Sequence, residues 1–121
     1  MISKKNRQMW LNRKRRIRKK VSGTSERPRL TVFRSAKQIY AQVIDDEQGK
    51  TLVSASSVEK DIRDKVKGEK NGVVAEKVGQ LLAERCQTAK IDKVVFDRNG
   101  YFYIGRIAKL ADAARKKGLK F

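Results

Sequence analysis

Apolar and polar residues alternate along residues 30–56, in three short runs separated by polar segments. The runs are Leu30–Arg34, Gln38–Ile44 and Thr51–Ser56. In the second run, Ile39, Ala41 and Val43 share one side, and a period of two is typical of strands with one buried face. The segments 35–37 and 45–49 have the composition of turns, and Gly49 can adopt a positive φ. The pattern predicts an antiparallel meander with one face more polar than the other.

A helical period follows the meander. Residues 58–70 are highly charged and are expected to form a loop, after which Asn71 can cap a helix over residues 72–89. The apolar residues that form its predicted buried stripe are Val74, Val78, Leu81, Leu82 and Cys86. A short apolar run, Lys93–Phe96, predicts a strand inside the sheet. A last helix over 105–116 places Ile107, Ala108, Ala111 and Ala114 on one side and ends before Gly118.

The element order βββαβα predicts an α/β fold with a mixed four-stranded sheet and two helices on one face. The fourth strand is expected to lie parallel to the first, because a helical crossover precedes it. The length of 121 residues suits one globular domain over residues 26–121. Residues 1–25 are set apart as a basic arm.

The arm has an extreme charge. Ten of the seventeen residues from Lys4 to Lys20 are Lys or Arg, and the whole chain has a net charge of +18. Like charges this close repel one another unless a polyanion neutralises them. We therefore expect the arm to be disordered alone and helical on RNA, and to be followed by a flexible break at 22–25 and an extended entry at Arg27-Pro28-Arg29.

Enzymatic chemistry has little support in the sequence. There is no histidine, no phosphate-binding glycine loop and one cysteine, Cys86, which falls on the buried stripe. Asp45, Asp46 and Asp97 superficially resemble the carboxylates of a metal nuclease, but Asp45 and Asp46 are better explained as turn residues. We expect no metal, cofactor, small-molecule substrate or membrane partner. No apolar run reaches the roughly 20 residues of a membrane span.

Two groups of residues are candidates for binding nucleic acid. The arm offers Arg13, Lys14, Arg15, Arg16, Arg18, Lys19 and Lys20 to phosphates. The second group combines aromatic and basic residues: Arg98, Asn99, Tyr101, Tyr103 and Arg106, with Arg34, Tyr40 and Gln42 on the polar sheet face. Unstacked RNA bases rest on aromatic rings and guanidinium planes, although each tyrosine is equally compatible with a half-buried core position. No helix-turn-helix, zinc finger or basic zipper is present.

Two separated motifs resemble a known family. The first comprises Glu26–Leu30, Val32–Ser35, Ile39–Gln42 and Val53–Ser56; the second comprises Val95–Arg98, Gly100, Tyr101, Tyr103, Gly105, Arg106, Leu110–Arg115, Gly118, Leu119 and Phe121. Together they resemble the bacterial large-subunit ribosomal proteins, number eighteen of that subunit, that bind 5S ribosomal RNA. The match spans nearly the whole chain. It departs at Ile104, where many relatives have histidine, and at Asn99, where glycine or serine is frequent.

The resemblance implies a cytoplasmic, ribosome-bound structural protein. It would bind 5S rRNA in the central protuberance, help attach it to the large-subunit rRNA and meet neighbouring ribosomal proteins. The RNA contacts that the family implies are Arg13 to Lys20, Arg27, Arg29, Arg34, Arg98, Tyr101, Tyr103 and Arg106. From the residues alone, two alternatives stay open: a DNA compaction or processing factor, and a degenerate nuclease.

Overall fold

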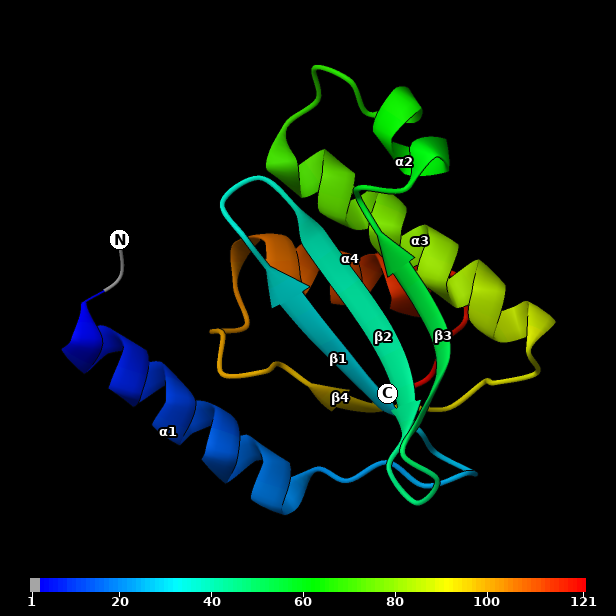
Figure 1. The fold of residues 1–121 in the computed structure, drawn as a ribbon. Coiled ribbons are helices and arrows are strands. Elements are labelled where there is room, and N and C mark those ends of the chain that lie inside the picture. The colour runs from blue at the N-terminus through cyan, green and yellow to red at the C-terminus, as the bar shows by residue number, and fades with distance from the viewer. Residues whose placement is uncertain (1–2) are drawn as a thin grey trace.

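The computed structural model describes residues 3–121 and contains a mixed sheet with helices on one side (Figure 1). Its elements are α1 (Lys4–Lys20), β1 (Arg29–Arg34), β2 (Ile39–Asp45), β3 (Lys50–Ser56), α2 (Lys60–Lys65), α3 (Asn71–Thr88), β4 (Val95–Asp97) and α4 (Gly105–Lys116). The predicted α/β class with four strands is confirmed.

The sheet has the strand order β3-β2-β1-β4. Strands β1 and β2 pair antiparallel with Val32 opposite Ala41, and β2 pairs antiparallel with β3 across an irregularity between Val43 and Ile44. Strand β4 pairs parallel with β1, as the helical crossover predicts. The central strands are therefore β1 and β2.

Helices α3 and α4 cover one face of the sheet (Figure 1). Val78, Leu82 and Leu110 have no exposed surface, so the core lies between these helices and the inward side chains of the strands. Gly79 allows α3 and α4 to approach closely, since a Cβ there would collide with the backbone carbonyl of Leu110. The opposite face of the sheet is free of α3 and α4.

Three details of the predicted helices are wrong. Residues 60–65 form the short helix α2 instead of a loop, because the spacing of Ile62 and Val66 lets both pack into the core despite the surrounding charges. Asn71 is the first residue of α3, and the capping position belongs to Lys70, which makes no side-chain cap. The buried stripe of α3 is also shifted: Val74 and Leu81 are half-buried, whereas Ala75, Gly79 and Ala83 are fully buried.

The fourth strand starts two residues later than predicted. Lys93 forms a bridge with Lys120 instead, and Val94 donates its N–H to the carbonyl of Lys120. The strand then runs to Asp97, whose carboxylate is fully buried. The segment around Lys120 therefore pairs with the residues that lead into β4, outside the four-stranded sheet.

Several local predictions are confirmed. Asp45 lies at a turn, where its Oδ1 accepts the N–H of Glu47 at 2.9 Å, and Gly49 has a φ of 62°. Cys86 is buried in the core, and burial raises the pKa of its thiol to about 11. Within residues 3–121, we find no helix with the length and apolarity needed to cross a bilayer.

Candidate nucleic-acid interface

Residues 4–20, for which the sequence left disordered and helical states open, form the helix α1. Ser3 caps it by accepting the N–H of Asn6 at 3.1 Å, and three cations occupy its last turn, where the helix dipole favours positive charge. The helix has no buried residue. Its stability therefore cannot come from an apolar face, and it depends on the contacts described next.

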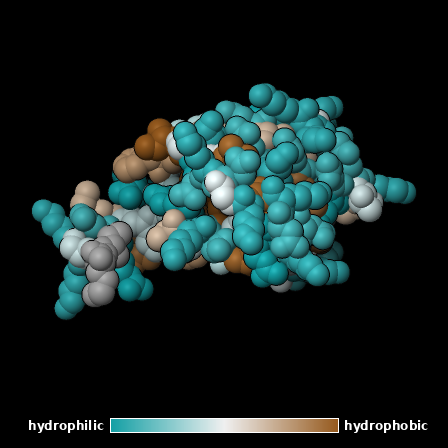
Figure 2. All heavy atoms as spheres, turned by 90° about the horizontal axis from the view of Figure 1, so that it is seen from above, coloured by the Kyte–Doolittle hydropathy of each residue, from teal (hydrophilic) through white to brown (hydrophobic). Residues whose placement is uncertain are grey.

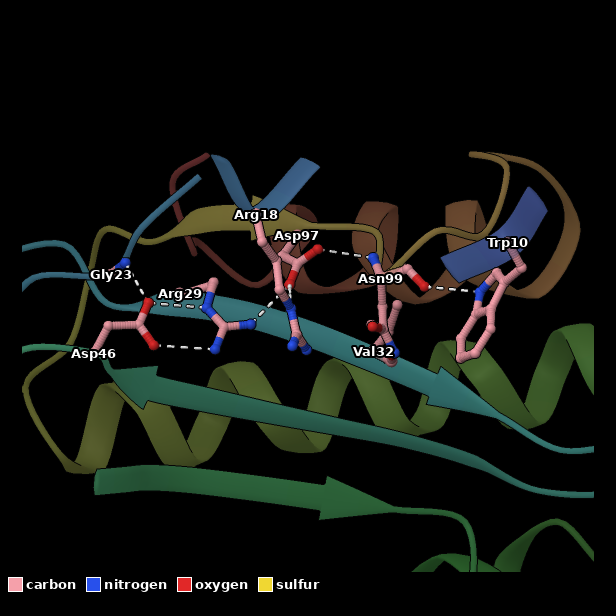
Figure 3. A network of polar contacts seen from close by, with 8 residues as sticks. All are labelled: Trp10, Arg18, Gly23, Arg29, Val32, Asp46, Asp97 and Asn99. Carbon is pink, nitrogen blue, oxygen red and sulfur yellow. Dashed lines mark hydrogen bonds and ion pairs between the residues drawn. The ribbon is translucent and has the colours of Figure 1, made fainter. Parts of the chain in front are cut away.

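Helix α1 is attached to the loop that follows β4. The indole Nε1–H of Trp10 donates to the carbonyl of Asn99 at 3.0 Å (Figure 3), and Arg13 Nε donates to the carbonyl of Gly100 at 3.0 Å. The Trp10 ring also lies 5.8 Å from the ring of Tyr101. A Cβ at Gly100 would lie only 2.8 Å from Trp10 Nε1, and Gly100 has a φ of 80°, so this approach requires glycine.

Asn99 anchors that loop to the sheet. Its side-chain Nδ2 donates to the carbonyl of Val32 at 2.8 Å, and its backbone N–H donates to Asp97 Oδ1 at 2.8 Å (Figure 3). Its φ of 55° is in the left-handed region that asparagine tolerates better than most residues. Asn99 is buried, so the loop carbonyls that receive α1 are held by the body of the protein.

A charge network lies under the other end of α1. Arg29 binds Asp46 through Nε at 2.9 Å and Asp97 through Nη1 at 2.7 Å, and Gly23 donates its N–H to Asp46 at 2.6 Å (Figure 3). Arg18, from α1, lies 3.6 Å from Asp97. The hydrogen bonds of Arg29 hold the pKa of Asp46 below its usual range, and the same bonds raise the pKa of Arg29. The network thus ties α1, the following linker and β1 to the end of β4.

The predicted interface residues fall into three groups. Those exposed on the surface are Arg15, Arg16, Arg18, Lys19, Lys20, Arg27, Arg34, Gln42 and Tyr103; those half-buried are Arg13, Lys14, Tyr40, Arg98, Tyr101 and Arg106. Arg29 and Asn99 are buried; the Arg29 guanidinium binds Asp97, and the Asn99 Nδ2 donates to the carbonyl of Val32. These two residues therefore help to hold the surface in place.

The structure brings the arm and one side of the aromatic cluster together. Arg34 lies over the ring of Tyr101 at 5.1 Å, and Arg106 donates to the carbonyl of Ser35 at 3.1 Å. A groove is lined there by Arg7, Trp10, Arg13, Phe33, Arg34, Tyr101 and Phe102. Tyr103 belongs to a different cluster, because its ring meets Phe96 edge-on at 5.7 Å and its hydroxyl accepts from Arg115 at 2.8 Å.

Sequence reasoning missed Trp10, Phe33 and Phe102 as site residues. Phe33 had a readable signal: Leu30 and Val32 point into the core, so the alternation places Phe33 on the open face, where 48% of its surface is exposed. Trp10 was recognisable only as a large aromatic residue within a run of charge. Its partner lies 89 residues away, and no local pattern reports that distance.

Taken together, α1 and the open sheet face form a strongly basic surface with exposed rings. In the described residues 3–121, Arg18 is the one cation of α1 with a carboxylate within 4 Å. Hydrophilic residues dominate the face seen in Figure 2, and hydrophobic ones show only in small groups. Such a surface can neutralise phosphates and support bases, and it shows no grouping of three or more acids or cysteines for a metal within those residues.

Comparison with known proteins identifies the family. The model of the family "Ribosomal L18 of archaea, bacteria, mitochondria and chloroplast" matches residues 3–121. Proteins named large ribosomal subunit protein uL18 are similar: that of Myxococcus xanthus is 60% identical over 92% of this chain and 93% of its own length. Those of Pseudothermotoga lettingae and Dictyoglomus thermophilum are 54% and 51% identical, over 100% of this chain in both cases and 100% and 99% of their own lengths. The chain therefore belongs to the ribosomal L18 family.

Proposed function

We propose that this member of the ribosomal L18 family is a structural, non-enzymatic constituent of the large ribosomal subunit that binds 5S rRNA and helps attach it to the large-subunit rRNA. The relatives are named as large-subunit proteins, and the chain covers nearly all of their length. The single observation that carries RNA binding is α1, a helix with ten cations and one nearby carboxylate among residues 3–121. Such a helix gains stability when a polyanion lies against it.

The proposed interface has two parts. Helix α1 and Arg27 form ionic contacts with phosphates. Arg34, Tyr101 and the open sheet face form a surface that is complementary in shape to the RNA. Arg98 donates a hydrogen bond to the carbonyl of Tyr101, and Arg106 donates one to the carbonyl of Ser35. These two arginines therefore position the surface as well as adding charge to it. We assign Tyr103 to its rim, Arg29 to its support, and Asn99 to both its support and its lining.

We further propose that residues 1–25 act as an arm and residues 26–121 as the body. The core contains no α1 residue, which supports a body that folds without the arm. Deleting residues 1–22 should therefore leave cooperative unfolding intact and flatten the salt dependence of RNA binding. A truncated chain that unfolds, or that keeps the full salt slope, would contradict this division.

The binding experiment measures affinity for 5S rRNA between 50 and 200 mM salt, with excess duplex DNA as competitor. If six to ten cations contact phosphates, affinity should fall by about 10³- to 10⁵-fold over that range. Equal competition by DNA would favour the alternative of a general nucleic-acid-binding protein. Repeating the measurement with a fragment of large-subunit rRNA tests the attachment role.

A matched pair of triple variants assigns the binding to α1. Arg15, Arg16 and Lys19 are exposed on α1, and their replacement by glutamine should reduce the salt slope by about three units. The control replaces Lys109 and Lys116 on α4 and Lys117 directly after it. These lysines are also exposed, and their replacement removes the same charge from the helix-covered side. Equal losses from both triples would mean that overall charge, and not α1, governs binding.

A further inference from the structure

A second groove lies on the open face of the sheet, opposite α3 and α4. It is lined by Arg18 of α1, by Thr31 and Phe33 of β1, by Tyr40 and Gln42 of β2, and by Asn99. Thr31 is paired with Gln42 and Phe33 with Tyr40 in the sheet, so these side chains share the same face. The lining of this groove suits a contact with a part of the RNA other than its phosphates. The assignment of that contact rests on the proposed RNA-binding function.

The groove has an aromatic wall. Phe33 is 48% exposed, and its ring centroid lies 5.9 Å from that of Tyr40 with the planes 43° apart. Because the rings are tilted and not stacked face to face, Tyr40 does not cover Phe33. A flat partner that stacks on Phe33 would remove exposed apolar surface from water.

The groove also has unsatisfied polar groups. Thr31 is 8% exposed and Asn99 is 5% exposed, and within residues 3–121 neither Thr31 Oγ1 nor Asn99 Oδ1 has a hydrogen-bond partner. The orientation of the Asn99 amide is set by the bond from its Nδ2 to Val32, so Oδ1 is the free end and can only accept. Buried polar groups without partners are rare in folded proteins and costly, so a ligand that brings a donor to these two oxygens gains affinity.

Charge at the groove favours an anion. The Arg18 side chain is 46% exposed, and its Nε is 3.6 Å from Asp97, so its terminal nitrogens stay available. The carboxylate of Asp97, which Arg18 contacts, is also bound by Arg29 at 2.7 Å. A phosphate beside Arg18 therefore meets a carboxylate that is already neutralised.

We propose that this groove receives one unstacked nucleobase of the bound RNA. The base stacks on Phe33, an exocyclic amino group on its edge donates to Asn99 Oδ1 and Thr31 Oγ1 after a small shift of the covering side chains, and its phosphate lies against Arg18. Adenine, cytosine and guanine carry such an amino group, and uracil does not. An unpaired nucleotide within a folded RNA fits this description, whereas a base inside a helix does not.

The test uses the full-length protein, 5S rRNA and two groove variants that leave the net charge unchanged. Phe33→Ala should weaken binding by about 5- to 150-fold, the range expected for one lost base stack. Thr31→Val keeps the shape of the side chain and removes the unpartnered hydroxyl. It should weaken binding while the melting temperature is no lower than that of the wild type, because a buried unpaired oxygen is lost.

Both losses should be the same at 50 and 200 mM salt, since no phosphate contact is removed. The control Thr88→Val, at the C-terminal end of α3 on the other side of the sheet, should not change affinity. If the wild type binds rRNA with a steep salt dependence and both groove variants bind equally well, the groove proposal is overturned and the proposed function stands. If the wild type does not bind rRNA, both fail.

Chemical probing identifies the nucleotide. Dimethyl sulfate modifies unpaired adenines and cytosines, and kethoxal modifies unpaired guanines. With one of these reagents, the wild-type protein should protect one base that becomes reactive again with Phe33→Ala. The control variant Val58→Ala, which removes another exposed apolar side chain that lies outside both grooves, should leave that base protected. Identical protection by wild type and Phe33→Ala would mean that no base depends on the Phe33 ring and would overturn the proposal.

Discussion

Helices α1 and α3 have nearly the same length, 17 and 18 residues, and are held in opposite ways. Helix α3 buries six residues in the core, among them Val78, Leu82 and Cys86. Helix α1 buries none and touches the body through Trp10, Arg13 and Arg18. Apolar packing makes α3 part of the fold, whereas α1 keeps its cations on the surface and is placed by a few polar contacts. The difference shows how one chain can combine a stable body with a surface that only an anionic partner completes.

The largest expected effect is on the buried helix. Leu82→Ala should lower the free energy of unfolding by about 2–5 kcal/mol, because it removes a fully buried side chain and leaves a cavity. The control is Arg16→Ala on α1, an exposed position where the change should stay within about 0.5 kcal/mol. Urea unfolding measures both. Similar values for the two variants would mean that the contrast between the helices is wrong.

The network beneath α1 should show the next largest effect. Asp97→Asn leaves the buried guanidinium of Arg29 with one carboxylate, Asp46, instead of two. Removing one partner of a buried ion pair typically costs about 3–5 kcal/mol, and the remaining pair reduces the expected loss to about 2 kcal/mol. Thermal unfolding at neutral pH provides the measurement. A variant as stable as the wild type would show that Asp46 alone is sufficient for Arg29.

A smaller effect is expected where α1 meets the loop. Gly100→Ala should cost about 1–2 kcal/mol for the left-handed backbone and should also displace Trp10. Gly49→Ala is the matched control, since its φ is 62° and a Cβ there meets open space. Trp10 is the one tryptophan of the chain, so its emission should shift to longer wavelength in Gly100→Ala alone. An equal emission in both variants would contradict the docked position of α1.

The smallest effect is on pH dependence. Because hydrogen bonds from Arg29 lower the pKa of Asp46 in the folded state, the ion pair contributes stability above the unfolded pKa of about 3.9 and loses it as the pH falls further. Stability measured by urea at pH 7, 4 and 3 should therefore fall less steeply below pH 4 in Asp46→Asn than in the wild type. Parallel curves would exclude Asp46 as a contributor to acid sensitivity.

The sequence was sufficient for most of the fold because its elements are encoded locally. The alternation around Ile39 and Val43 identified the meander, and the helical crossover identified the parallel strand. Helix α2 was missed because charged residues surround Ile62 and Val66 and hide a short apolar repeat. Short elements with few buried residues, such as α2, therefore could not be predicted from the sequence.

The candidate site was less accessible to sequence reasoning. Clustered charge identified the arm, but the attachment of Trp10 to Asn99 joins residues that no pattern connects. From the sequence, Arg29 is indistinguishable from an arginine that binds phosphate. Only its ion pairs with the distant residues Asp46 and Asp97 show that it stabilises the fold. Charge density is thus readable from a chain, whereas the neutralisation of a particular charge depends on tertiary structure.

The parallel pairing of β4 with β1 also bears on the order in which the molecule assembles. The meander joins neighbouring segments, while Thr31 and Asp97 must meet across most of the chain, and long closures are slow. We therefore expect the strand hairpins to form first and β4 to join last, carrying with it the loop carbonyls that receive Trp10. A partly folded molecule without β4 in the sheet would lack the loop carbonyl to which Trp10 of the N-terminal helix donates. A docked N-terminal helix therefore indicates that folding is complete.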